Sequence, residues 1–146
     1  MGLLLGLGML VISAFGAWRP ATTPDKTTNS TKSISRHIAL LKTGKAQEKA
    51  AAAYWLGQQH VAAAPAVDPL VELLADTTEI DPLKYRTSKI LQKLTLGEEA
   101  AAALVNIGRP SIDALIRVLK TSPAAEARKN AAWALGALHD LGATQI

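Results

Sequence analysis

The chain has 146 residues, with 16 Lys and Arg against 12 Asp and Glu, three His and no Cys. This length corresponds to one ordinary domain at most. The absence of cysteine excludes a disulfide framework, a thiolate metal site, a cysteine nucleophile and a lipid-bearing cysteine. Alanine supplies 27 residues and aromatic side chains only 4%, which favours closely packed helices over a β-sandwich or barrel. The net charge of +4 allows weak attraction to anionic partners without requiring one.

Residues 1–19 are dominated by an apolar run, residues 2–18, that contains no charged side chain. As a secretory signal peptide, the run would end at the small-x-small site Ala14-Phe15-Gly16. As an N-terminal membrane anchor, it has the shortest length that spans a bilayer, ~17 residues. Export or an outward-facing tether, periplasmic or extracellular, is the favoured interpretation. The alternative is an inward-facing anchor, because the basic residues that follow the run would hold the domain in the cytoplasm.

Residues 20–33 are rich in Thr, Ser and Pro and have no large apolar side chain. Such a stretch buries too little surface to offset the loss of chain entropy. We therefore expect a flexible spacer before the folded domain, which the sequence places at residues 34–146.

Two sequence motifs alternate in this domain. The first, PAVDPLVELLAD at 65–76, aligns without gaps with PSIDALIRVLKT at 110–121, and ISRHIALLKT at 34–43 is a third copy. The second, AAAYWLG at 51–57, aligns with NAAWALG at 130–136, and AAAALVNIG at 100–108 is related to both. Because alanine content alone would not also align Pro, Asp, Leu and Gly, the sequence indicates an internal repeat.

Both motifs have helical periodicity. Ile112, Leu115, Ile116 and Leu119 recur at i, i+3, i+4 and i+7, which gives one apolar stripe. The glycines that end the second motif, at 57, 108 and 136, are expected to form left-handed C-caps. The patterns predict helices over 33–43, 46–57, 66–75, 82–94, 98–107, 110–120 and 124–138. One pair of such helices cannot bury its apolar stripes, whereas stacked pairs can.

Three stretches, YWLG…PAVDPLVELLAD, LVNIGRPSIDALIRVLK and AAWALGALHDLGA, resemble the HEAT-repeat family, in particular its short repeats of the phycobilin-lyase type. The resemblance covers about 34–143. It implies an all-α fold, an α-solenoid of about two and a half to three HEAT-like helix pairs, preceded here by the apolar N-terminal helix. It also implies a protein that binds other macromolecules.

We expect no catalytic residues. His37, His60 and His139 fall in different repeats without metal-ligand spacing, and the chain has no Gly-rich phosphate loop, GxSxG or HExxH motif. HEAT-like hydroxylases bind iron through His-Glu pairs, but Val61 follows His60 here. The sequence thus predicts a non-enzymatic chain with no metal and no cofactor.

The resemblance implies that the second helix of each pair lines a concave face that binds a protein partner. Solvent-facing positions there are Glu72, Asp113, Arg117 and Lys120, whose mixed charges favour a polar protein surface. Trp133 aligns with Tyr54, so we expect both rings in the core. Trp55 aligns with the small Ala134, so we expect its ring to point away from the core. It is therefore the candidate aromatic residue that anchors a partner. The leading hypothesis is an exported or membrane-tethered protein-binding scaffold.

An alternative function is binding to a nucleic acid or another anionic surface through basic clusters. Arg36 and Lys42 lie near the start of the domain, and a helix over 82–94 would carry an exposed ridge of Lys84, Arg86, Lys89 and Lys93. A solvated face balanced by nearby carboxylates is the simpler interpretation. The apolar N-terminal segment further disfavours a nucleic-acid partner. Anionic lipid headgroups close to such an anchor are an equally good target for the basic clusters.

Overall fold

The computed structural model describes residues 26–87 and 93–143. The chain divides into two compact units, Met1–Lys32 and Ser33–Ile146. The predicted signal peptide or anchor, residues 1–19, lies outside the described residues. None of the helices in the described ranges is both long enough and apolar enough to cross a membrane.

Helix α2 (Lys26–Thr43) begins well before the predicted start at residue 33. It replaces the expected flexible spacer over residues 26–33, which is a correction to the sequence analysis. Once a helix has formed over the apolar positions Ile34 and Leu41, each added residue upstream gains a backbone hydrogen bond at little cost. Threonine side chains also fold back onto the helix, since Thr31 Oγ1 donates to the Thr27 carbonyl at 2.9 Å.

The prediction of an all-α fold is confirmed. After α2 the helices follow in the order α3 (Ala46–Gly57), α4 (Val67–Glu72), α5 (Leu96–Ile107), α6 (Ile112–Thr121) and α7 (Ala125–Ala143). Short 3-10 turns, η1 (His60–Ala66) and η3 (Arg109–Ser111), lead into α4 and α6 and contain the repeat-equivalent Pro65 and Pro110. Pro110 suits the start of η3 because the first helical residues need no N–H partner, whereas Pro65 lies near the end of η1, shortly before α4 begins.

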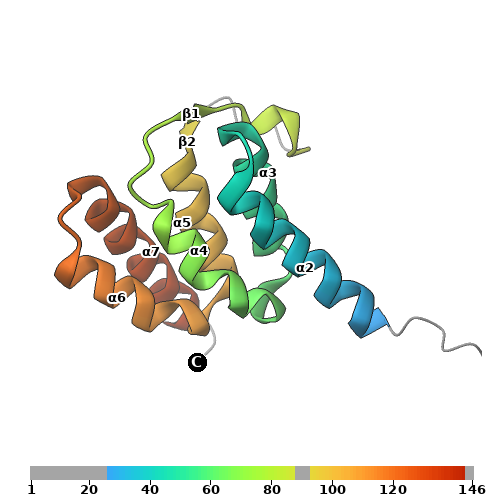
Figure 1. The fold of residues 1–146 in the computed structure, drawn as a ribbon. Helices are drawn as coiled ribbons and strands as arrows, with labels where there is room; N and C mark the ends of the chain where they lie inside the picture. The colour runs from blue at the N-terminus through green and yellow to red at the C-terminus, as the bar shows by residue number, and fades with distance from the viewer. Residues whose placement is uncertain (1–25, 88–92, 144–146) are drawn as a thin grey trace, which may run out of the picture. The chain divides into compact units, whose positions relative to one another are not determined.

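The second unit has two layers of helices (Figure 1), in which α4 and α6 lie in front of α3, α5 and α7. Within the rear layer α3 packs on α5 and α5 packs on α7, while α4 contacts α6. The front helices carry the proline-led motif and the rear helices carry the alanine-rich motif. Both layers contribute to the largest fully buried apolar side chains, which are Leu56, Leu70, Leu74, Leu96, Leu104, Ile107 and Leu115.

The predicted helix over 82–94 is wrong in the part of this stretch that the structure describes. Residues Glu79–Ile80 (β1) pair antiparallel with Leu94–Thr95 (β2). Among the described residues between these strands, 81–87 and 93, only Pro82–Lys84 (η2) is helical, as a single 3-10 turn. Asp81 caps this turn by accepting a hydrogen bond from the Leu83 N–H at 3.1 Å. Residues 82–87 then follow an irregular path that we call the strap. Residues 88–92 are not described.

The expected left-handed C-caps are not formed, although Gly108 does end α5 with a positive φ. Gly108 has φ 88° and ψ −138°, a backbone conformation that L side chains rarely adopt. Gly57 and Gly136 have no positive φ and belong to helices α3 and α7. A Cβ on Gly57 would lie 3.1 Å from the Ala103 Cα, so this glycine permits α3 and α5 to approach closely.

Candidate functional site

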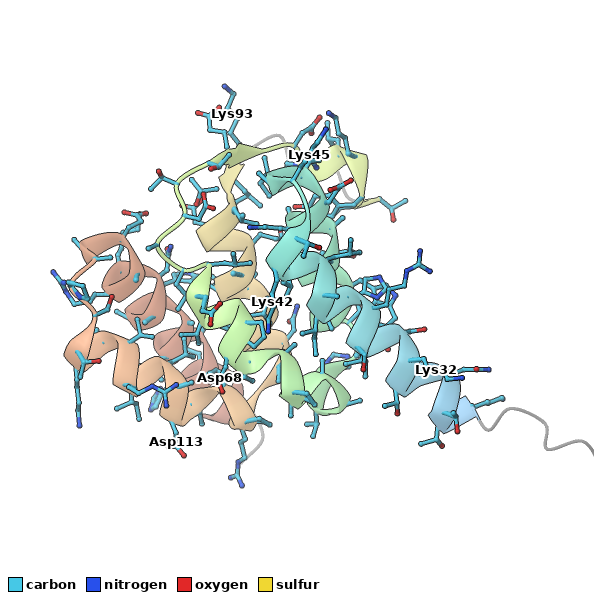
Figure 2. All side chains as sticks on the ribbon, viewed as in Figure 1. Lys32, Lys42, Lys45, Asp68, Lys93 and Asp113 are labelled. Carbon is cyan, nitrogen blue, oxygen red and sulfur yellow. The ribbon has the colours of Figure 1, made fainter. Side chains whose placement is uncertain are left out.

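Four charged residues that the sequence singled out come together on the neighbouring helices α4 and α6. Glu72 lies on α4, and Asp113, Arg117 and Lys120 follow one another at i, i+4 and i+7 on α6, all of them exposed. The guanidinium of Arg117 contacts the Asp68 carboxylate of α4 at 3.2 Å and so joins the two helices. Figure 2 labels Asp68 and Asp113 on these two helices. We call this surface the α4–α6 face.

The ion pair that joins α4 and α6 at this face is exposed and weak. The side chains of Arg117 and Asp68 are 62% and 80% exposed, and an ion pair this exposed contributes about 0–1 kcal/mol to stability. Its charged groups therefore remain free to reorganise around a partner at little cost in folding free energy.

Trp55 does not belong to the α4–α6 face. It lies on α3, half-buried, with its ring stacked on the His37 ring of α2 at 3.8 Å between centroids and 10° between planes. The two rings line a hollow of about 460 Å³ together with Leu40 and Tyr85. Trp55 is thus less available to a partner than the sequence suggested, because a histidine of the preceding helix covers one of its faces.

Tyr54 and Trp133 align in the repeats and were both expected in the core, but their surroundings differ. Tyr54 is half-buried, with the Tyr85 ring 5.6 Å away and the Arg86 guanidinium 4.7 Å above its ring. Trp133 is 56% exposed and lies in a groove between α5 and α7. The two positions differ because the strap packs on Tyr54, a long-range contact that repeat alignment does not reveal.

The predicted basic ridge is not formed. Arg86 turns inward, where its Nη2 lies 2.5 Å and 2.6 Å from the two carboxylate oxygens of Glu99 on α5. Lys93 is exposed and contacts Glu79 at 3.0 Å. Lys84 is exposed on η2, and Lys89 lies outside the described residues. In the other predicted cluster, Arg36 and Lys42 are both exposed on α2.

Glu99 is a buried acidic residue that sequence reasoning missed, since its side chain is only 1% exposed. Tyr85 Oη donates to its carboxylate at 2.9 Å. Burial, and then the charge and hydrogen bond of Glu99, raise the pKa of Tyr85 above its usual range. Burial lowers the pKa of Arg86, but its hydrogen bond and charge interaction with Glu99 outweigh this and raise it overall. A sequence signal existed, because Glu99 shares a helical stripe with the buried Ala103 and Ile107.

These contacts form a structural charge cluster, because the Glu99 carboxylate is buried and its partners Tyr85 and Arg86 both come from the strap. Among residues 26–87 and 93–143, no group of three His, Asp or Glu side chains is placed to hold a metal ion. His60 Nδ1 instead lies 3.1 Å from the Asn106 carbonyl, and His37 Nδ1 lies 2.7 Å from the Ser33 carbonyl. No family model, curated protein or solved structure matches this chain.

Proposed function

We propose that residues 34–146 are a non-catalytic protein-binding scaffold of the HEAT-repeat type, an α-solenoid of about two and a half to three helix pairs. Three features support this proposal. The proline-led and alanine-rich motifs occupy separate layers. Pro65 and Pro110 both lie in 3-10 segments that lead directly into α4 and α6. The repeat-equivalent Leu70 and Leu115 are both fully buried.

The observation that carries the binding proposal is the group of exposed charged residues on the neighbouring helices α4 and α6, which the Asp68–Arg117 pair joins. It combines the carboxylates of Asp68, Glu72 and Asp113 with the cations of Arg117 and Lys120. A polyanion would meet three carboxylates here, whereas a polar protein surface offers charges of both signs. Complementary charges at such a surface act mainly on the rate and specificity of association.

We further propose that the scaffold is exported or tethered to a membrane through residues 2–18. The support is the uncharged run itself, which has the length and composition of a signal peptide or a short anchor. A partner would then be a protein of the same compartment.

The test is a quantitative pull-down with the full chain from extracts of its native cells. The variant is the double charge reversal Arg117→Glu/Lys120→Glu, and the control is Lys42→Glu/Lys84→Glu, which makes the same change in net charge elsewhere on the exposed surface. We expect at least one protein to be retained by the wild type and the control and lost from the variant. If both variants retain the same proteins as the wild type, the α4–α6 face is not the binding surface.

Anionic-surface binding is the second candidate, and exposed Arg36 and Lys42 support it. It is weakened because Arg86 is committed to Glu99 and Lys93 is paired with Glu79. Retention on heparin separates the two functions, since only polyanion binding predicts steep salt dependence. Loss of steep retention in Arg36→Glu/Lys42→Glu would favour the second candidate.

A further inference from the structure

The rear helices cover one another in chain order. Helix α5 packs on α3, and α7 packs on α5. Among the described residues no further rear helix follows α7, and Figure 1 shows α6 and α7 at one end of the two layers. The side of α7 that corresponds to the α5-covered side of α3 is therefore left without a neighbouring helix in the described part of the chain.

Repeat-equivalent residues show which side chains are left uncovered in the rear layer. Ala53, Leu56 and Gly57 of α3 are all buried. Their equivalents on α7 are exposed, half-buried and exposed, in the order Ala132, Leu135 and Gly136. The spacing i, i+3 and i+4 places these three residues on one side of the helix. The same sequence motif is thus buried in α3 and open in α7.

The front layer shows the same difference. Helix α7 covers the end of α4, since Asn130 Nδ2 donates to the Leu74 carbonyl at 2.8 Å, and the Leu74 side chain is fully buried. Leu119 of α6, the equivalent of Leu74, is 40% exposed. A rear helix placed beyond α7 would cover it in the same way. We call the surface formed by these uncovered residues the end face, and its members are Leu119, Ala132, Leu135 and Gly136.

The helices that cover their predecessors show what fits such a face. The buried stripe of α5 consists of Leu96, Ala100, Ala103 and Ile107. The stripe of α7, buried or half-buried, consists of Ala127, Ala131, Ala134 and Leu138. Both have the spacing i, i+4, i+7 and i+11, with alanine at the two central positions and a large aliphatic side chain at the last.

The central alanines of the stripe permit a close approach. A Cβ on Gly57 would lie 3.1 Å from the Cα of Ala103, so α5 leaves no room for a side chain there. At Gly136 no described atom lies within 4 Å of such a Cβ. The end face therefore has an open position of the kind that Ala103 fills on α3.

We propose that the end face binds one amphipathic helix of a partner protein, which packs alongside α7 as α5 packs alongside α3. Its apolar stripe has alanine at i+4 and i+7 and leucine or isoleucine at i+11. A second copy of this chain does not offer such a stripe, because those of α5 and α7 are already occupied within the fold. The proposal rests on the repeat equivalence of the proposed function but not on the α4–α6 face.

The test uses the full chain and a fluorescein-labelled peptide of residues 95–108, followed by fluorescence anisotropy. The peptide carries Glu99→Asn, because the carboxylate would lose Arg86 and because Asn130 stands at the same place in the stripe of α7. A second peptide adds Ala103→Leu, which makes it more apolar but too bulky for the glycine. We expect saturable binding of the first peptide and binding of the second that is weaker by about tenfold or more.

Two matched variants assign binding to the end face. Gly136→Leu fills the open position and should weaken binding of the first peptide about tenfold or more, while leucine favours the helix more than glycine does. Gly142→Leu is the control, because Gly142 lies on the same helix and also has no described atom within 4 Å of an added Cβ. Circular dichroism of both variants checks that α7 stays folded.

The proposal is overturned if the first peptide shows no saturable binding, or if Gly136→Leu and Gly142→Leu bind it equally well. Equal binding of the Ala103→Leu peptide would also overturn it. Sedimentation without peptide covers the remaining occupant, since self-association that Gly136→Leu abolishes would assign the end face to a second copy.

The variant Arg117→Glu separates this proposal from the proposed function. Arg117 pairs with Asp68 on the α4–α6 face, so its reversal should leave peptide binding unchanged. Peptide binding that persists when the pull-down fails would refute the α4–α6 face alone. A pull-down that succeeds without peptide binding would refute the end face alone.

Discussion

The guanidinium of Arg86 lies against the buried carboxylate of Glu99, with Nη2 2.6 Å from Oε2. Arg86 is on the strap and Glu99 is in the first half of α5, so the pair fastens the irregular segment to the central helix of the rear layer. Tyr85 and Tyr54 enclose it, through a hydrogen bond to the carboxylate and a cation–π contact with the guanidinium. The cluster replaces the cationic ridge that the sequence predicted.

Removal of the arginine should therefore be strongly destabilising. Arg86→Ala leaves the Glu99 carboxylate buried without its counter-charge, and we expect the free energy of unfolding to fall by about 3–5 kcal/mol. Urea denaturation measures this loss. The control is Lys84→Ala on the exposed η2 turn, with an expected effect within about 0.5 kcal/mol. Similar losses in both variants would contradict a structural role for the pair.

Tyr85 should make stability fall with pH under alkaline conditions. Burial and the Glu99 carboxylate raise the pKa of Tyr85 in the folded chain, so the phenol keeps its proton after the unfolded chain has lost it. Its contribution is complete below about pH 10, the pKa of an unfolded tyrosine, and is lost as pH rises above that value. Urea denaturation at pH 8 and pH 10.5 gives the free energy of unfolding at each pH. Between these pH values it should fall more for the wild type than for Tyr85→Phe. Equal losses would show that Tyr85 is not titrating in this way.

Repeat-equivalent leucines should differ in their energetic contributions. Leu74 is fully buried, whereas its equivalent Leu119 on α6 is 40% exposed. We expect Leu74→Ala to cost about 2–5 kcal/mol, as for a filled core position, and Leu119→Ala about 1 kcal/mol or less. Thermal unfolding of the two variants gives the comparison. A larger loss for Leu119→Ala would show that the burial of these side chains is misassigned.

The equivalent glycines Gly57 and Gly136 should respond to alanine with opposite signs. A Cβ at position 57 would press on the α5 backbone at the Ala103 Cα, 3.1 Å away, whereas at position 136 nothing lies within 4 Å. Gly57→Ala should destabilise by about 1 kcal/mol or more. Gly136→Ala should stabilise by about 0.5–1 kcal/mol, because alanine favours the helix and glycine does not. Denaturant midpoints of both variants test the pair, and a stabilised Gly57→Ala would refute the close approach of α3 and α5.

The sequence predicted best where local signals decide the structure. Helix α3 spans Ala46–Gly57 as expected, because a run of alanines favours helix at every position. Helix α5 also starts close to its predicted boundary, since Thr95 and Glu98 form a capping box. The charged residues of the α4–α6 face follow from two equivalent helices, so aligning the repeats was enough to place them on neighbouring elements.

The strap was not predictable in this way. Arg86 and Lys93 do have helical spacing in the sequence. In the described part of this stretch, the pairing of Ile80 with Leu94 and the ion pair of Arg86 with Glu99 outweigh local helix propensity. Both interactions join residues 13 or 14 positions apart, which a periodicity argument does not detect. The difference between Tyr54 and Trp133 was missed for the same reason, because the strap packs on Tyr54 through Tyr85 and Arg86.

The central position of α5 has a consequence for how the chain can be divided. This one helix contacts α3, α4 and α7, and it contributes Leu96, Leu104 and Ile107 to the shared interior. A fragment that stops before Leu96 would leave Leu56, Leu70 and Leu74 in water, so a split protein should regain its native state only when both pieces are present. We therefore expect the helices that pack on α5 to unfold together with it.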